Sequence, residues 1–193
     1  IYTAETLFPY TTLFRSDSKL PLRGTQTSAG YDFYATEDLV IKPQEKIMFW
    51  SDVKAQMQEG EVLLGFVRSS MGIKNDLMLS NTVAVIDSDY YNNEKTGGNI
   101  GISIRNMKPA IGITGKQMLV PSDNIVVSEK GKEVVPMVMP ILEDLTEKNT
   151  VVIKKGERVA QFIFMSFQES ENCNTDVVRT GGIGSTTEEA KQE

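Results

Sequence analysis

The segment AVIDSDYYNN, residues 84–93, gathers side chains that could take part in hydrolysis. Asp87 and Asp89 are separated by one residue, and Tyr90 follows directly. A carboxylate placed in this way can hold a water molecule and accept its proton during attack on an electrophile, which is general-base catalysis. The alternative is structural, with AVI as a strand and DSDYYNN as the polar turn that ends it. The segment alone is compatible with both interpretations.

Two further segments carry groups that bind anions. In VRSSMG, residues 67–72, Arg68 and two serines follow an apolar run, and a turn there would direct hydroxyl and backbone N–H groups at an anion. The alternative is a serine that caps a short helix. In RTGGIGSTT, residues 179–187, glycines and hydroxyls could wrap a chain of phosphates, or the segment could be a flexible C-terminal tail.

Two polar residues lie in segments that otherwise resemble strands. Gln161 lies in GERVAQF, and Asp32 lies in SAGYDFYA, two residues after Gly30. A buried amide must find hydrogen-bonding partners, so Gln161 either stabilises the fold or contacts a ligand. Taken alone, the segment around Asp32 indicates only a turn that enters a strand.

The composition excludes several kinds of site. The chain of 193 residues has no histidine, which rules out Ser-His-Asp triads, Cys-His pairs and histidine-ligated zinc. A hydrolase of this composition would use a carboxylate base, and a metal would be a hard cation held by oxygens. The net charge of −6 and the absence of a basic run argue against nucleic-acid binding but allow a small phosphorylated ligand.

The expected location is cytoplasmic. Cys173 is the single cysteine, so no disulfide can form within the chain. No apolar run reaches about 18 residues, so no transmembrane helix and no membrane partner are expected.

The elements that must position these groups are strands. GISIRN, residues 101–106, alternates apolar and polar residues with the period of a half-buried strand. Apolar or β-branched runs at 61–68, 81–86 and 158–167 have strand length, and residues 38–50 suggest two short strands around a proline-containing turn. A short helical turn is expected only at 71–74. Many short strands with glycine-rich turns predict an all-β sandwich, jelly roll or barrel.

The chain divides into four expected parts. Residues 109–150 contain four prolines and a hairpin pattern around Lys130-Gly131, which suggests an insert in a β core. The expected parts are an N-terminal segment 1–16, a core formed by 17–108 and 151–178, the insert 109–150, and a flexible C-terminal arm 179–193. The stretch TLFPYTTLFRS, residues 6–16, resembles translated sequencing-adapter read-through, so 1–16 is interpreted as artefactual, with a genuine short strand as the alternative.

Together, the five segments resemble the five motifs of the trimeric deoxyuridine triphosphatases (dUTPases). The matching segments, in chain order, are AGYDFYA, RSSMG, NTVAVIDSDYYNN, GERVAQ and RTGGIGST. The form DYYNN and the R-x-G-G spacing are similar to the branch found in Gram-positive bacteria and their phages. The insert lies at a position similar to that of an insert in staphylococcal phage dUTPases. The resemblance implies a jelly-roll or β-clip barrel that assembles as a homotrimer.

The resemblance also assigns a reaction and roles. Water would attack the α-phosphorus of dUTP and release dUMP and pyrophosphate, which limits uracil incorporation into DNA and supplies dUMP for thymidylate synthesis. Asp87 would hold the water, Gln161 would assist it, and Tyr90 would pack against deoxyribose and exclude a 2′-hydroxyl. Asp89 is expected to be structural. The implied substrate-binding residues are Arg68, Ser69, Ser70, Asn81, Ala84, Ile86, Tyr90, Arg179, Ile183, Gly184, Ser185 and Thr186.

The implied cofactor is Mg²⁺ bound across the three phosphates, with Asp32 reaching it through water. The resemblance implies that each site takes the hairpin from one chain, Arg68 and Gln161 from a second, and the arm with Arg179 from a third. Ile183 departs from the family pattern, because members usually carry phenylalanine there to cover uracil.

Two alternatives remain from the sequence. One is a dCTP deaminase, which shares this fold, although the 81–90 hairpin and the glycine-rich tail favour dUTPase. The other is a regulatory protein of the dUTPase fold that binds a protein partner through 109–150.

Overall fold

Strands are the main secondary structure of the described residues, as the sequence predicts. The computed structural model describes residues 18–120, 125–128, 131–134, 136–171, 179, 181 and 182. The strands are β1 (Leu22–Arg23), β2 (Tyr31–Tyr34), β3 (Leu39–Ile41), β4 (Lys46–Trp50), β5 (Glu61–Val67), β6 (Leu77–Leu79), β7 (Ala84–Asp87), β8 (Gly101–Asn106), β9 (Ile111–Val120), β10 (Ile125–Ser128), β11 (Gly131–Val134), β12 (Met137–Asp144), β13 (Val151–Ile153) and β14 (Arg158–Ser166). The helical segments are α2 (Ser69–Asn75), α3 (Thr146–Asn149) and the 3₁₀ turn η1 (Ser88–Tyr90).

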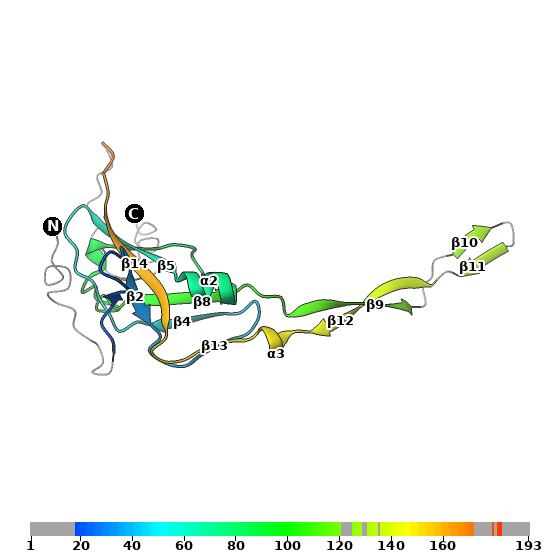
Figure 1. The fold of residues 1–193 in the computed structure, drawn as a ribbon. Coiled ribbons are helices and arrows are strands. Elements are labelled where there is room, and N and C mark those ends of the chain that lie inside the picture. The colour runs from blue at the N-terminus through cyan, green and yellow to red at the C-terminus, as the bar shows by residue number, and fades with distance from the viewer. Residues whose placement is uncertain are drawn as a thin grey trace.

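The main sheet has five strands in the order β1-β2-β14-β5-β7 (Figure 1). Strand β14 is its centre and pairs antiparallel with both β2 and β5. Phe33 of β2 and Phe162 of β14 pack with ring centroids 4.3 Å apart in the core. Gly65 of β5 lies opposite Phe162, and a Cβ at Gly65 would lie 2.3 Å from the ring. The absence of a side chain at residue 65 therefore allows this ring to enter the core.

Smaller sheets cover the other side of this core. Strands β4, β8 and β6 form one of them, and β13 pairs with β3 in another. The alternation predicted for residues 101–106 is confirmed, because Ile102 and Ile104 are buried while Gly101, Ser103 and Arg105 are more exposed. Asn106 is fully buried at the end of β8, where its side-chain amide donates to the backbone oxygens of Ile41 and Asn149 at 2.9 and 2.8 Å. This amide fixes β8 against β3 and α3.

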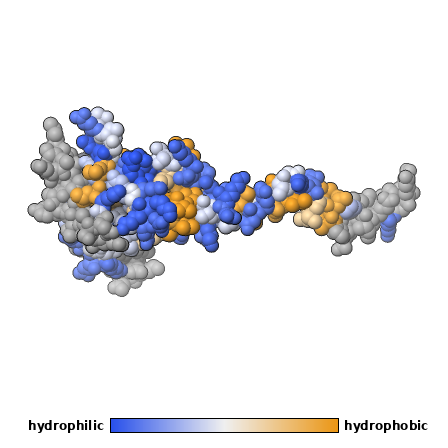
Figure 2. All heavy atoms as spheres, turned by 60° about the horizontal axis from the view of Figure 1, so that its bottom comes forward, coloured by the Kyte–Doolittle hydropathy of each residue, from blue (hydrophilic) through white to orange (hydrophobic). Residues whose placement is uncertain are grey.

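A two-stranded ribbon, formed by β9 and β12, projects from the core, with the β10–β11 hairpin beyond it (Figure 1). The ribbon pairing shifts by two residues between Pro140 and Leu142, and Gly115 takes a φ of 78° on the opposite strand. The ribbon lies within the expected insert 109–150. Apolar residues gather along it (Figure 2), and several are largely exposed: Ile111, Ile113, Met118, Leu119, Met137, Val138, Met139 and Leu142.

Some element boundaries differ from the sequence expectation. The short helix is longer than predicted, since α2 covers Ser69–Asn75 instead of 71–74. The strand expected at 81–86 begins only at Ala84, because Thr82 takes a φ of 62° in a turn. The expected pair of strands in 38–50 is confirmed as β3 and β4. Residues 1–16 lie outside the described residues.

Candidate active site

A cavity of about 490 Å³ opens beside the segment that joins β6 to η1. Asn81, Ala84, Ile86 and Tyr90, all predicted to bind substrate, line this cavity. Strand β7 is held by β5, with Ile86 opposite Leu63. Alternation along β7 then directs Ala84 and Ile86 to the same face. The structure therefore brings the four predicted residues of the hairpin to one hollow surface.

Tyr90 is fixed as a wall of this cavity. Its side chain is almost buried, and its hydroxyl donates to the backbone oxygen of Asn99 at 2.7 Å. The Asn93 amide donates to the Tyr90 backbone oxygen and to Thr96 Oγ1, both at 2.8 Å. A ring held at both ends cannot rotate away, so it limits which groups fit beside it.

Arg179 approaches the two aspartates of the hairpin within the same chain. Its Nε donates to Asp89 Oδ1 at 2.8 Å, and its Nη2 donates to Asp87 Oδ2. Arg179 and Gly182 also line the cavity. The expectation that the arm reaches the hairpin from a third chain stays a prediction. Ile183, Gly184, Ser185 and Thr186 lie outside the described residues.

A second group of predicted residues surrounds Asp32, which is 5% exposed. Arg68 Nε donates to Asp32 Oδ1 at 3.1 Å, and Arg158 Nη1 donates to Asp32 Oδ2 at 3.2 Å. Gln161 is the cross-strand neighbour of Asp32. A Cβ at Gly30 would lie 3.2 Å from Gln161 Oε1, so the absence of a side chain at Gly30 leaves room for this amide. The buried carboxylate thus brings two guanidinium groups and the amide together.

The two serines of RSSMG do not cap α2. Arg68 occupies the N-cap position, and no side chain caps the helix. Ser69 is exposed, whereas Ser70 lines a cavity of about 390 Å³ together with Arg68 and Arg158. Neither this cavity nor its lining residues overlap with the cavity beside Tyr90. Within one chain, the hairpin residues predicted to bind uracil and deoxyribose therefore line a different cavity from Arg68 and Ser70.

Arg158 and Phe162 are among the residues of these surfaces that the sequence did not predict. Arg158 lies in the quoted segment GERVAQF, and a charged residue at the start of an apolar strand was the available signal for its pairing with Asp32. Phe162 lines the cavity beside Tyr90, although Phe162 is also fully buried in the core. Its hydrophobicity predicted only a core position.

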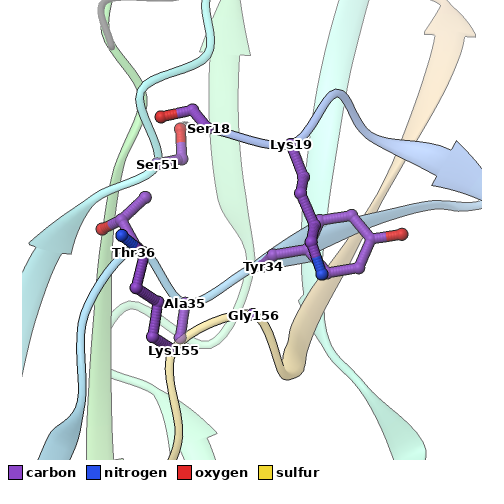
Figure 3. A pocket seen from close by; sticks show the side chains of 8 residues that line it. All are labelled: Ser18, Lys19, Tyr34, Ala35, Thr36, Ser51, Lys155 and Gly156. Atoms are coloured by element: carbon purple, nitrogen blue, oxygen red, sulfur yellow. The ribbon is translucent and has the colours of Figure 1, made fainter. Parts of the chain in front are cut away.

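A third cavity, of about 320 Å³, is lined by none of the predicted site residues (Figure 3), although it shares Tyr34 and Gly156 with the cavity beside Arg68. Its polar groups are used for internal contacts. Ser18 Oγ donates to Asp52 at 2.9 Å, Thr36 Oγ1 donates to the Trp50 backbone oxygen at 2.8 Å, and Lys19 Nζ lies 5.3 Å from the centre of the Tyr34 ring. These contacts explain the three polar side chains as parts of the fold.

Metal binding by protein groups alone has little support in the described ranges. No cluster of three acidic, cysteine or histidine residues is found there. Asp32 accepts one hydrogen bond on each oxygen, and each carboxylate oxygen can accept a second. Such an acceptor fits a water of a hydrated Mg²⁺ that is held mainly by substrate phosphates. Among the helices of the described part, none is long and apolar enough to cross a membrane.

Comparison with known proteins identifies the family. The dUTPase family model matches residues 16–117, which include the Asp32, Arg68 and Asp87 segments. The chain belongs to the dUTPase family. A dUTP nucleotidohydrolase of Lactococcus lactis is 41% identical over 124 residues, which are 64% of this chain and 73% of the relative. The predicted membership of this family is thus confirmed.

Solved dUTPase structures share the all-β fold. The Streptococcus mutans dUTPase aligns with a TM-score of 0.59 and 32% identity over 84% of this chain and 98% of its own. The dUTPase of Staphylococcus aureus phage phi11, whose structure visualises a species-specific insert, aligns with a TM-score of 0.58 and 27% identity over 86% of this chain and 95% of its own. The predicted all-β class and the similarity to bacterial and phage dUTPases are confirmed.

Proposed function

We propose that this protein hydrolyses dUTP to dUMP and pyrophosphate. The observation that carries the proposal is the cavity that Asn81, Ala84, Ile86 and Tyr90 line beside Asp87. A cavity of about 490 Å³ has the size of a small-molecule site, and it presents backbone groups, an amide and an aromatic wall. Its relatives in Lactococcus lactis and other organisms are dUTP nucleotidohydrolases.

In the proposed binding mode, the uracil edge pairs with Asn81 and with backbone groups near Ala84 and Ile86. Tyr90 packs on deoxyribose, and its hydrogen bond to Asn99 keeps the ring where a 2′-hydroxyl would collide with it. Ile183, in the arm, covers the base in place of the usual phenylalanine. An aliphatic side chain at this position provides apolar contact but no ring stacking.

In the proposed reaction, Asp87 accepts a proton from the attacking water. The water oxygen forms a bond to the α-phosphorus, and the bond from that phosphorus to the bridging oxygen of the β-phosphate breaks. Pyrophosphate takes the released electron pair. General-base assistance contributes about 10²–10⁴-fold, so alignment of water by Gln161 and stabilisation of charge by cations must supply the remainder.

The triphosphate is assigned to Arg68, Ser69 and Ser70, and to the arm with Arg179, Gly184, Ser185 and Thr186. Asp32 is assigned to a water of Mg²⁺ carried by the phosphates. When bound, this ion would neutralise charge that develops on the phosphates. A structure of the phage phi11 relative reveals a structural Mg(II) ion, which supports a role for the metal in this family.

The active form is proposed to be a homotrimer with shared sites. The separation of the Tyr90 and Arg68 cavities within one chain supports this arrangement, because one chain alone does not bring the two surfaces together. A closed assembly of identical chains joins such surfaces across each interface. We assign the activity to the cytoplasm, where it would limit uracil incorporation into DNA and supply dUMP for thymidylate synthesis.

Pyrophosphate release from each dNTP and from UTP, with and without Mg²⁺, tests the function. We expect selective turnover of dUTP. Asp87→Asn preserves the shape of the side chain and should lower kcat by about 10²-fold or more. Asp76→Asn, at the end of α2, serves as a charge-matched control. Ammonia release from dCTP would instead support the deaminase, and wild-type turnover by Asp87→Asn would remove this residue from the mechanism.

A second function in protein binding is proposed for the ribbon within 109–150. Its apolar side chains are largely exposed on both strands, including Leu119 and Val138, which are 67% and 54% exposed. Exposed apolar patches of this kind mark interaction surfaces. Phage dUTPases related to this chain control the transfer of virulence genes, which supports a regulatory partner. Affinity capture with the full chain and with a Leu119→Ser/Val138→Ser variant tests this surface, while dUTP turnover by the variant verifies the fold.

A further inference from the structure

The loop between η1 and β8 places Thr96 against the end of the Tyr90 side chain. Thr96 Oγ1 donates to the Tyr90 hydroxyl oxygen at 3.3 Å, and the Tyr90 hydroxyl donates to the Asn99 backbone oxygen at 2.7 Å. Among the described residues, Thr96 is not one of those that line the cavity beside Tyr90. Thr96 can therefore influence a ligand in this cavity only through the residues that do line it.

Asn93 directs the Thr96 hydroxyl towards Tyr90. Asn93 is 6% exposed, and its side-chain N–H donates to Thr96 Oγ1 at 2.8 Å, while its Oδ1 accepts from the Thr96 backbone N–H at 2.9 Å. Asn93 Oδ1 also lies 3.1 Å from Thr96 Oγ1. However, the lone pair that accepts from an amide and the O–H bond of the same hydroxyl point in different directions, so the proton is not directed at that amide. The Tyr90 oxygen is the acceptor that remains.

The loop that carries Thr96 is itself anchored. Lys54 Nζ donates to Asn92 Oδ1 and lies 4.8 Å from the centre of the Tyr91 ring. Gly98 takes a φ of 84°, and a Cβ at Gly98 would lie 2.7 Å from the Asn92 backbone nitrogen. The absence of a side chain at residue 98 thus lets the loop close tightly on itself. Thr96 is therefore a fixed point against which the Tyr90 hydroxyl rests.

The position of this contact gives it a large effect on the ring. The hydroxyl lies at the end of the Tyr90 side chain that is farthest from the backbone, so a shift there tilts the whole ring. Repulsion between overlapping atoms changes far more steeply with distance than dispersion attraction does. A small retreat of the ring would therefore relieve a collision with a 2′-hydroxyl while it weakens the contact with deoxyribose only slightly.

We propose that Thr96 is a positioning residue for sugar selection, because its hydrogen bond keeps the Tyr90 ring close to the 2′-carbon of a bound nucleotide. The proposal rests on the proposed function and adds a residue outside the cavity that sets its specificity. A neutral hydrogen bond changes an equilibrium by about two- to tenfold. Loss of the Thr96 hydroxyl should therefore change the preference for dUTP over UTP by a factor of this size.

Thr96→Val removes the hydroxyl and keeps the shape, Thr96→Ser keeps the hydroxyl, and Thr150→Val makes the same change at a hydroxyl that donates to the Thr146 backbone oxygen at the end of α3. We expect Thr96→Val to lower the ratio of kcat/KM for dUTP over UTP about two- to tenfold, mainly through a gain with UTP. Thr96→Ser should recover most of the ratio, and Thr150→Val should resemble the wild type.

The ratio separates positioning from a loss of stability, because a smaller folded fraction lowers turnover of both nucleotides equally. An unchanged ratio in Thr96→Val would therefore overturn the proposal, whatever its melting temperature. In a Tyr90→Phe background, which lacks the tyrosine hydroxyl, Thr96→Val should have no further effect on the ratio. An additional fall there would overturn the proposal as well, because Thr96 would then act without the Tyr90 hydroxyl.

Nuclear magnetic resonance of protein with ¹³C-labelled tyrosine gives a readout that does not depend on activity. Without nucleotide, the Tyr90 Cζ signal, assigned by its loss in Tyr90→Phe, should shift in Thr96→Val and stay in place in Thr150→Val. An unshifted signal in Thr96→Val would refute the contact. A wild-type protein that does not hydrolyse dUTP would refute the proposed function, while the Cζ signal would still show whether Thr96 holds Tyr90.

Discussion

Two inactive variants should restore activity to each other when they are mixed in one trimer. Asp87→Asn removes the proposed base on the hairpin, and Arg68→Gln removes a guanidinium from the second cavity while it retains a donor for Asp32. Asp87 and Arg68 belong to segments that line separate cavities of one chain. If the active site joins these surfaces across an interface, a single site draws the two residues from different chains.

The expected recovery follows from symmetry. In an equal mixture, the chain that supplies the hairpin has an intact Asp87 in half of all sites, and the neighbour that supplies Arg68 is intact in half. About one quarter of the sites are then complete, so the mixture should reach about one quarter of the activity of refolded wild type. Each variant alone should retain about 1% or less, because loss of the base or of a charged donor costs on the order of 10²-fold or more.

The assay is pyrophosphate release from dUTP after the variants are denatured together, refolded and isolated as trimers by size exclusion with light scattering. Unmixed variants that are refolded in parallel give the background. Mixed trimers that show only this background would refute the shared site, because a site built within one chain always carries one of the two lesions. A fully active monomer would refute it as well.

The same experiment with Asp87→Asn and Arg179→Ala tests the origin of the arm. If the arm reaches the hairpin from a third chain, as the family resemblance implies, the mixture should recover about one quarter of the activity. Mixed trimers without recovery would show instead that Arg179 acts on Asp87 and Asp89 of its own chain, as in the contacts within one chain.

Two further predictions concern sugar selection and acid stability. Tyr90→Ala should narrow the ratio of kcat/KM for dUTP over UTP. Tyr90→Phe keeps the ring but loses the hydrogen bond to Asn99, so it should narrow the ratio less. An unchanged ratio in Tyr90→Ala would place sugar selection elsewhere. Hydrogen bonds from Lys154 and from the Lys155 backbone lower the pKa of Asp38 below 3.8. The ionised carboxylate therefore stabilises the fold above pH 3.8. This stabilisation is lost as the pH falls through the pKa of Asp38 in the folded protein. The melting temperature of Asp38→Asn should therefore lie below that of wild type at neutral pH, and the gap should shrink below pH 3.8, whereas a constant gap would contradict this linkage.

The candidate site could be predicted from sequence only where its groups are close together in the chain. The segment 81–90 supplies Asn81, Ala84, Ile86 and Tyr90, and the turn and strand that join them bring all four to one cavity. In contrast, Asp32 and Arg158 are separated by 126 positions and meet only because β14 pairs with β2. No local pattern in either segment identifies the other as its partner.

By itself, the sequence determined the strand character and the chemical possibilities of the chain. The alternation in β8 predicted a half-buried strand because successive side chains of a strand point to opposite faces. The absence of histidine limited the base to groups such as carboxylates. The tertiary structure decided which distant residues meet, because strand order and register are non-local. Phe162 lines the cavity beside Tyr90. Asp89, which was expected to be only structural, accepts a hydrogen bond from Arg179. A period of two fixes the face of a strand on which a residue lies, but only pairing fixes the residue opposite it.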